Sequence, residues 1–160
     1  MEYGVTSVGR TSTFRDVLVR DGLYAALGFL NNRVDFRFTG VYRFDGAILR
    51  NVCLFDREAP GESGGQDAPV SQTYCGITGS GGDVLNVENG QVDPRFPWMQ
   101  GSAVIAYCGV PVFEPRGDVI GTVCHFDLRP CRIPKAELPT IRTAAGLVWT
   151  YCLAADATIC

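Results

Sequence analysis

Histidine is almost absent from this sequence, since His125 is the only one among 160 residues. A catalytic pair of histidines and a metal site built from several histidines are therefore excluded. The sequence has seven cysteines, an odd number, and no two of them have the CxxC spacing. A secreted disulfide framework is therefore not expected. We expect most of the cysteines to be small buried apolar residues.

Charge is also sparse. Charged residues make up 19% of the chain, the net charge is -3, and no dense lysine and arginine cluster occurs, which argues against a nucleic-acid partner. No apolar run reaches the length of a membrane span, and the N-terminus lacks the apolar core of a signal peptide. With 46% hydrophobic residues, the sequence predicts a single globular domain over residues 1–160, cytoplasmic and without a membrane partner.

The first third of the chain predicts a helix followed by a β-hairpin. Thr13 and Asp16 have the spacing of a capping box, so a helix is expected to run from there to about Asn31, with a kink near Gly22. Residues 34–44 then alternate between apolar and polar side chains, as in a half-buried strand. Asp45-Gly46 is a hairpin turn signal, and residues 47–55 are the expected return strand.

The middle of the chain is less regular. Residues 56–68 are rich in glycine, proline and acidic residues, which predicts a mobile surface loop. Two interpretations of this loop stay open, a lid over a ligand cavity and a plain connector. A helical turn is expected over residues 70–77 and a short strand over 83–87. Pro94 is expected to open a further helical turn within residues 93–96.

The last third of the chain predicts a buried hairpin and a terminal helix. Residues 103–113 and 119–127 are apolar on both faces, so both strands should lie centrally in the sheet with a layer on each side. Pro134 and Pro139 suit the start of a final helix. Its apolar residues follow the spacing of a helix-pair seam, namely Leu138, Ile141, Ala145, Val148, Cys152, Ala155 and Ile159. The fold class that follows is α+β, with a sheet of about six strands between terminal helices.

Four segments occur in an order that is similar to a known family. They are Thr73-Tyr74-Cys75-Gly76, Val92-Asp93-Pro94-Arg95-Phe96, Gly109-Val110-Pro111, and Gly121-Thr122-Val123-Cys124-His125-Phe126-Asp127 with Pro130. Together they resemble the GAF domain, whose fold is PAS-like. The resemblance implies a largely antiparallel sheet with the terminal helices on one face, and short helices and loops covering a ligand cavity on the other. It also implies a homodimer through the terminal helices.

The resemblance and the need of a cavity for apolar walls with a few polar groups indicate nine candidate ligand-binding residues. They are Phe38, Tyr74, Cys75, Asp93, Arg95, Phe96, Tyr107, Thr122 and Phe126. Arg95 is proposed as a bidentate partner for an anionic ligand. No catalytic residue, metal ligand or cofactor is assigned.

Cysteine and histidine chemistry gives several alternatives. Cys124 and His125 are adjacent on one strand and should point to opposite faces, so they cannot form a nucleophile–base pair. Some GAF proteins attach a bilin to a cysteine, which does not fit Cys124, and others bind haem through a histidine, which leaves His125 as one candidate. Cys75 is the better candidate for a reactive thiol. Cys131 and Cys160 are expected to be the more exposed thiols.

The sequence therefore predicts a non-catalytic sensory GAF-like domain that binds an unidentified small molecule and acts as a dimer in signal transduction, passing its signal to a separate output protein. The predicted mechanism is ordering of the 56–68 loop by the ligand, transmitted across the sheet to the terminal helices. One alternative is a cysteine-based redox sensor or an enzyme like the free methionine sulfoxide reductases, although that subfamily's local cysteine pattern is not seen. The other is a dimerisation module without a ligand.

Overall fold

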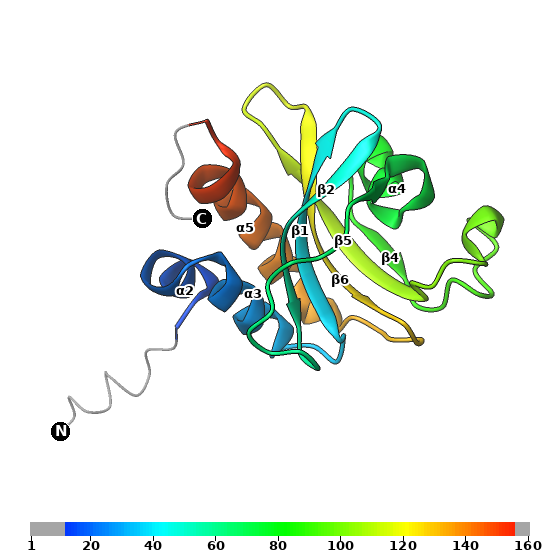
Figure 1. Cartoon of the computed structure of the whole chain (residues 1–160), viewed down its shortest axis with the longest axis horizontal. Coiled ribbons are helices and arrows are strands. Elements are labelled where there is room, and N and C mark those ends of the chain that lie inside the picture. Colours follow the sequence, from blue (N-terminus) through cyan, green and yellow to red (C-terminus); the bar gives the residue numbers. More distant parts are fainter. Residues whose placement is uncertain (1–11, 156–160) are drawn as a thin grey trace.

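One antiparallel sheet of six strands runs through the molecule, in the order β3-β2-β1-β6-β5-β4. The structure is a computed structural model that describes residues 12–155 (Figure 1). The elements in chain order are α2 (Phe14–Asp21), α3 (Leu23–Asn31), β1 (Phe38–Asp45), β2 (Ile48–Asp56), β3 (Ala68–Pro69), η1 (Val70–Gln72), α4 (Tyr74–Gly81), β4 (Leu85–Val87), η2 (Pro97–Met99), β5 (Ala106–Phe113), β6 (Val119–Asp127), η3 (Lys135–Glu137), α5 (Leu138–Val148) and η4 (Trp149–Leu153).

Helices cover the sheet on both faces. The terminal helices α2, α3 and α5 pack on one face, and α4 packs on the other against β5 and β6 (Figure 1). The alternation of β-strand side chains divides the core accordingly. Val41, Val110 and Val123 join the apolar cluster under the terminal helices. Tyr42 and Cys124 join a second cluster under α4. The predicted α+β architecture with a sheet of six strands is thus confirmed.

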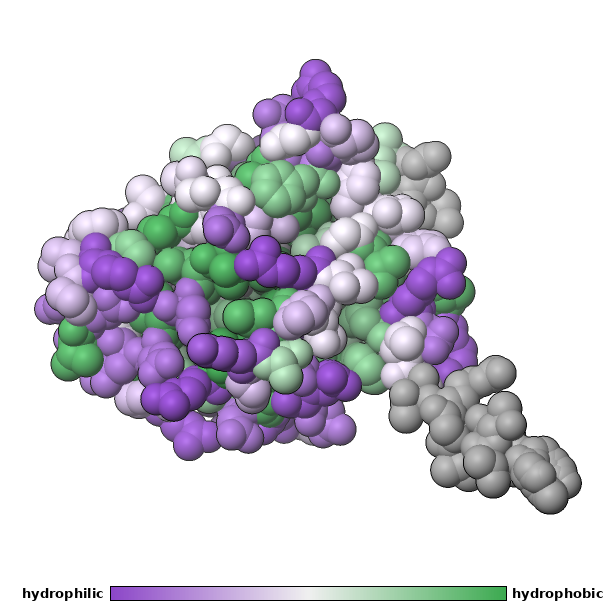
Figure 2. Space-filling view, turned by 180° about the vertical axis from the view of Figure 1, so that it is seen from behind, coloured by the Kyte–Doolittle hydropathy of each residue, from purple (hydrophilic) through white to green (hydrophobic). Residues whose placement is uncertain are grey.

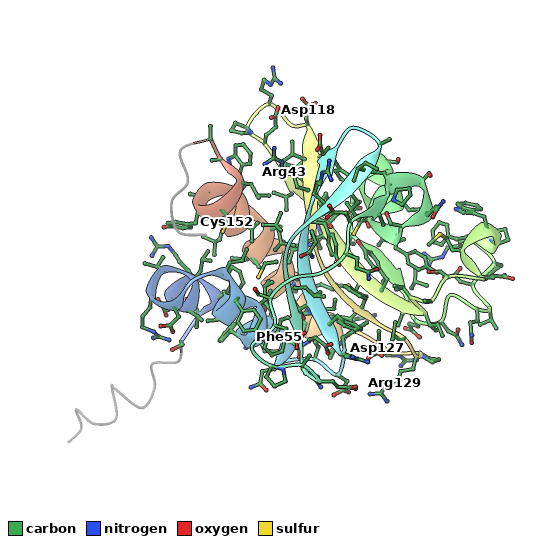
Figure 3. All side chains as sticks on the ribbon, viewed as in Figure 1. Arg43, Phe55, Asp118, Asp127, Arg129 and Cys152 are labelled. Carbon is green, nitrogen blue, oxygen red and sulfur yellow. The ribbon has the colours of Figure 1, made fainter. Side chains whose placement is uncertain are left out.

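The first helix begins and bends where the sequence predicts. The Thr13 side chain accepts the backbone N–H of Asp16 at 3.1 Å, and the Asp16 carboxylate accepts the backbone N–H of Thr13 at 3.0 Å, which completes the capping box. Gly22 separates α2 from α3 with a φ of 92°, a value that glycine adopts readily. The helix then continues over Phe55 of β2, whose ring would lie 3.0 Å from a Cβ atom at Gly28 (Figure 3).

The two expected hairpins are both present. β1 and β2 are joined through Asp45 and Gly46, with Gly46 at a φ of 59°. β5 and β6 pair with each other, and β6 lies between β5 and β1 at the centre of the sheet. Every residue of β5 except Phe113 is buried. The prediction that this hairpin is central and covered on both sides is confirmed.

The first strand starts later than residue 34, because side chains from α3 and from the end of β6 bind the backbone groups before it. Asn31 donates from Nδ2 to the carbonyl oxygen of Phe36 at 2.9 Å. The Asp127 carboxylate, at the end of β6, accepts the backbone N–H of Arg37 at 2.9 Å. Residues 34–37 therefore turn towards the end of β6, where Asp127 and Arg129 lie together (Figure 3), and the ladder of β1 begins at Phe38.

Two helix predictions were wrong in position. Residues 93–96 form an open turn in which the Asp93 carboxylate accepts the backbone N–H of Arg95, and the helical turn begins only at Pro97. The regular part of the final helix ends at Val148, after which residues 149–153 widen into a π-helical turn. In that region the Thr150 hydroxyl donates to the carbonyl oxygen of Gly146 at 3.2 Å. The predicted seam residue Ile159 and the thiol of Cys160 lie outside the described residues.

The seam residues of the final helix that the structure describes pack against other helices of the same chain. Ile141, Ala145 and Val148 are buried in the cluster that also holds Leu18 and Leu27 of the N-terminal helices. On the outside, hydrophilic residues surround a hollow of apolar residues on the side opposite to that of Figure 1 (Figure 2). Within residues 12–155, no helix combines the length and the apolar character needed to cross a bilayer.

Candidate functional site

A cavity of about 150 Å³ lies between the sheet and the elements that cover its second face. Its walls come from β1, β2, β3, β5 and β6 on one side, and from η1, α4, η2 and their adjoining loops on the other. The lining residues are Tyr42, Leu49, Gln66, Ala68, Gln72, Thr73, Tyr74, Cys75, Met99, Ser102, Val104, Tyr107, Cys124 and Phe126. None of these lining residues, all of which lie within residues 12–155, carries a charge.

The cavity has a buried floor and a polar rim. Cys75, Tyr107 and Cys124 are at most 4% exposed and form the floor. Gln66 and Gln72 are exposed and lie at the rim. An apolar pocket with a few amide and hydroxyl groups at its edge is the usual form of a small-molecule site.

Local sequence fixes the helix that closes the cavity. Thr73 is the N-cap of α4 and accepts the backbone N–H of Gly76 at 3.0 Å. The helix ends at Gly82, which adopts the left-handed conformation with a φ of 65°. Tyr74 and Cys75, the first two residues after this N-cap, are thereby turned towards the sheet, where both are buried.

A glycine on β5 allows the phenol of Tyr107 to reach the floor of the cavity. The hydroxyl end of Tyr107 occupies the place that a Cβ atom at Gly109 would take. The ring therefore lies back along its own strand, and its hydroxyl contacts Thr78 Oγ1 at 3.1 Å and Cys75 Sγ at 3.3 Å. The Gly-Val-Pro motif thus has a packing function at its first residue.

Several polar groups converge on the sulfur of Cys75. Thr122 donates from Oγ1 to Cys75 Sγ at 3.1 Å, and Tyr107 donates its hydroxyl to the same sulfur. Burial raises the pKa of Cys75, but the interactions with Cys124, Thr122 and Tyr107 together lower it below the ordinary value of a thiol. Burial and the neighbouring Cys75 raise the pKa of Cys124 well above that value. Cys75 is therefore the more acidic thiol of the two.

The structure brings six of the nine predicted residues to the cavity or directly behind its wall. Tyr74, Cys75, Tyr107 and Phe126 line it. Thr122 is fully buried behind Cys75. Phe38 stacks on Phe126 with ring centroids 4.7 Å apart, and so supports the wall from β1.

The other three predicted residues lie beside the cavity. Phe96 packs edge-on against Tyr74, with centroids 6.4 Å apart. Arg95 donates to the Asp93 carboxylate at 2.7 Å and to the backbone carbonyl of Asn86 at 2.7 Å. The Arg95 guanidinium lowers the pKa of Asp93. The Arg95 guanidinium, which was proposed to bind an anionic ligand, therefore donates its hydrogen bonds to groups of its own chain and does not line the cavity.

Sequence reasoning missed residues that only tertiary packing brings to the cavity. Tyr42 could have been recognised from the sequence as a lining candidate, because it lies on the apolar face of an alternating strand. Gln66, Gln72 and Met99 could not have been recognised in this way, since each belongs to a loop or a short helical turn whose direction depends on the rest of the fold. The remaining unassigned lining residues are Leu49, Ala68, Thr73, Ser102, Val104 and Cys124.

His125 lies on the opposite face of the sheet from Cys124, as strand alternation predicts. It is 1% exposed, stacks on Phe36 and shares a 2.7 Å hydrogen bond between its Nδ1 and the hydroxyl of Thr39. Thr39 in turn accepts from Asn31 Nδ2, and Asn31 Oδ1 accepts from Arg57 at the surface. Burial, together with the charge of Arg57, lowers the pKa of His125 to about 3.

His125 is therefore part of a buried series of hydrogen bonds, in which its Nδ1 atom is bonded to Thr39. The haem alternative gains no support from this position, which lies away from the cavity. The described residues contain no group of three or more histidine, cysteine, aspartate or glutamate side chains placed to hold a metal ion.

Comparison with solved structures identifies the fold as the GAF fold. The chain is similar to a type II free methionine-R-sulfoxide reductase from Thermoplasma acidophilum, with 15% identity, a TM-score of 0.63, and coverage of 81% of this chain and 89% of that one. It is also similar to the GAF domain of an Acinetobacter phosphoenolpyruvate-protein phosphotransferase, with 16% identity, a TM-score of 0.62, and coverage of 90% and 84%. A free methionine-R-sulfoxide reductase from Neisseria meningitidis, solved with its substrate, matches with 17% identity, a TM-score of 0.62, and coverage of 88% and 91%. No protein-family model and no curated protein sequence matches the chain.

Proposed function

We propose that this chain is a non-catalytic sensory domain that binds a small uncharged molecule in the cavity beneath α4. The observation that carries the proposal is the cavity itself, whose buried floor is apolar and aromatic and whose rim offers amide and hydroxyl groups. A charged ligand would lose its hydration on entering without gaining an ionic partner from the walls, which is costly. A neutral ligand has no such cost.

The size of the cavity limits the ligand further. Its volume of about 150 Å³ equals that of engineered apolar cavities of about 150 Å³ that hold benzene. The ligand class is therefore a single-ring aromatic or a compact aliphatic molecule, with one polar group directed to Gln66, Gln72 or Ser102 at the rim. Larger ligands require movement of α4 or of the loops.

The enzyme alternative is weaker on the same ground. Free methionine sulfoxide is the substrate class named for two of the structurally similar proteins, and a free amino acid carries both an ammonium and a carboxylate group. Binding it by direct contact calls for charged or strongly polar partners. Among residues 12–155, the side chains that line the cavity are all uncharged, so this cavity fits a zwitterion poorly.

The loop between β2 and β3 provides a route by which a bound ligand affects the terminal helices. At one end Gln66 lines the cavity. In its middle Gly61 donates its backbone N–H to the hydroxyl of Tyr24 on α3 at 2.8 Å. Along its length it is held to β2, since Leu54 donates to the carbonyl oxygen of Ser63 at 2.8 Å. The loop thus contacts both the site and the helical layer, and we propose that a ligand orders it.

Thermal unfolding with a charge-matched set of probes tests the binding proposal. Benzamide is neutral, benzoate is an anion and benzylamine is a cation, while all three have one ring and a similar size. Benzamide is expected to raise the melting temperature, by roughly 5–10 °C at a hundredfold excess over its Kd. Free methionine sulfoxide is included as the ligand expected of the enzyme alternative.

A cavity-filling variant provides the control. Ala68→Phe places a ring in the cavity and should abolish the shift with benzamide, whereas Ala136→Phe on the exposed helical turn η3 should leave it unchanged. If no neutral probe raises the melting temperature while methionine sulfoxide does, the non-catalytic proposal is wrong. If nothing in the set binds and Ala68→Phe raises the stability of the free protein, the cavity is only a packing defect.

A further inference from the structure

Two of the five free thiols in the described residues meet at one place. Cys75 and Cys124 both line the cavity and belong to the same buried cluster. Cys53 lies in the cluster under the terminal helices, and Cys108 lies on the opposite face of β5. Cys131 is half-buried in the segment after β6. Among these five free thiols of residues 12–155, the pair at the cavity floor is therefore the one placed to react together.

The surroundings make the two thiols unequal. The sulfur of Cys75 accepts hydrogen bonds from the hydroxyls of Thr122 and Tyr107, at 3.1 Å and 3.3 Å. Cys75 also stands in the first turn of α4, where the backbone N–H groups favour a negative charge. Cys124 lies on the central strand β6, fully buried, so that its thiol keeps its proton. One thiol is arranged as a nucleophile, and the other is arranged as the thiol that reacts next.

We propose that Cys75 and Cys124 form a dithiol redox site that a small hydroperoxide converts to an intramolecular disulfide. The site shares the cavity with the ligand proposed above but does not depend on that ligand. Its substrate class follows from the cavity, which admits a compact and uncharged oxidant such as hydrogen peroxide or an alkyl hydroperoxide.

The reaction balances in two steps. The sulfur of Cys75 attacks the terminal oxygen of the hydroperoxide, an S–O bond forms and the O–O bond breaks. The thiol proton of Cys75 goes to the departing alkoxide, which leaves as an alcohol, and Cys75 becomes a sulfenic acid. The sulfur of Cys124 then attacks that of Cys75, an S–S bond forms and the S–O bond breaks. The thiol proton of Cys124 leaves with the hydroxyl group as water.

In total the two thiols lose two electrons to one hydroperoxide, which becomes one alcohol and one water. Return to the dithiol requires a thiol reductant, whose own two thiols become a disulfide. Tyr107 acts as a positioning residue, because its hydroxyl reaches Cys75 but does not touch the reacting oxygen atoms.

Peptide mapping of the oxidised full chain tests the proposal. The reduced protein is treated with tert-butyl hydroperoxide, remaining thiols are alkylated after unfolding, and the peptides are analysed by mass spectrometry. The expected product is a linked pair of peptides carrying Cys75 and Cys124, with two hydrogen atoms lost and full reversal by dithiothreitol. Phenylarsine oxide, which bridges two neighbouring thiols, should protect the same two cysteines from alkylation.

Matched variants assign the roles. Cys124→Ser should stop the reaction at a sulfenic acid on Cys75, and Cys75→Ser should abolish it, while Cys108→Ser should behave like the unmodified chain. Tyr107→Phe should slow the oxidation and move its dependence on pH upward, a change that a purely structural role would not produce.

Oxidation confined to Cys131, or full alkylation of Cys75 and Cys124 after treatment with both reagents, overturns the proposal. The result is independent of the ligand-binding proposal, because a failed shift with benzamide leaves the disulfide measurement unchanged.

Discussion

The chemistry of single residues depends here on the two-residue period of one strand. Cys124 and His125 are neighbours in sequence, yet the sheet separates them into two different environments. Cys124 faces a cavity and a second thiol. His125 faces Phe36 and Thr39 in the layer that the terminal helices cover. The only histidine of the sequence therefore lies outside the cavity, and the reactive groups of the cavity are sulfur and hydroxyl.

His125 makes the stability of the protein depend on pH in a definite window. Its pKa falls to about 3 in the folded chain, whereas an unfolded chain has a histidine pKa near 6.5. Below about pH 6.5 the unfolded state gains a proton that the folded state does not take up, so the free energy of unfolding falls as pH falls. The expected loss is about 1.4 kcal/mol for each pH unit between 6.5 and 4.

Urea unfolding at half-unit steps of pH measures this loss. His125→Asn is the matched variant, because it removes the titrating group, and its stability should be nearly constant between pH 6.5 and 4. Below about pH 4 both proteins should weaken, because Asp56 and Asp67 have lowered pKa values and lose their hydrogen-bonded charge there. An unmodified chain with constant stability from pH 6.5 to 4 would show that His125 is protonated in the folded state.

The residues of the site differ in how far the sequence could identify them. Tyr107 and Phe126 were candidates as aromatic residues of the central hairpin, but both faces of that hairpin are apolar, so alternation alone could not decide which face lines the cavity. Tyr74 and Cys75 follow from the motif at the start of α4. Arg95 was expected at the cavity, but nothing local indicated that Asp93, two residues away, would bind its guanidinium outside the wall.

At the scale of elements, local signals predicted the first helix and the hairpin turn, whereas contacts with side chains outside the strand decided where β1 begins. The capping box at Thr13 and the turn at Gly46 involve neighbours in sequence, and both predictions were confirmed. The start of β1 depends on Asn31 and Asp127. Asp127 comes from the far end of β6, so the alternation of residues 34–37 could not reveal this start.

The loop of residues 57–67 is the element whose role is easiest to test. It is exposed for most of its length, as predicted, but it is fastened to α3 through the hydroxyl of Tyr24. Tyr24→Phe removes this one hydrogen bond and keeps the ring that packs against Phe55. If the loop couples the cavity to α3, benzamide should protect its amides from hydrogen exchange in the unmodified chain and protect them several-fold less in the variant.

Tyr151→Phe is the matched control for this measurement. It also removes one hydroxyl from the helical layer, since Tyr151 accepts from Arg15 at 2.8 Å, but that hydroxyl does not touch the loop. Its loop protection should equal that of the unmodified chain. Equal protection in Tyr24→Phe would show that the loop is a plain connector.

At the scale of the whole molecule, the apolar residues of the last helix could pack against a second copy or against the other terminal helices of the same chain. In this fold they pack within the chain. Ile141, Ala144 and Val148 are at most 1% exposed within a single chain. They pack in the same cluster as Phe14 and Leu27, so this seam joins the terminal helices of one molecule. The GAF resemblance predicts a dimer through the terminal helices, and we propose that such a dimer uses the outer faces of these helices.

Among residues 12–155, Val19 on α2 is a large apolar side chain exposed on the outside of these helices, with an exposure of 50%. Multi-angle light scattering on the full chain should show a dimer, and Val19→Glu should convert it to a monomer, because a carboxylate would be buried between the two copies. Val52→Glu is the control, since Val52 is an equally apolar residue that lies on β2 and is 39% exposed. A charge at Ile141 would not be informative, because it would destabilise the fold itself. A monomeric unmodified chain would exclude the dimer. A Val19→Glu variant that stays dimeric would show that the interface lies elsewhere.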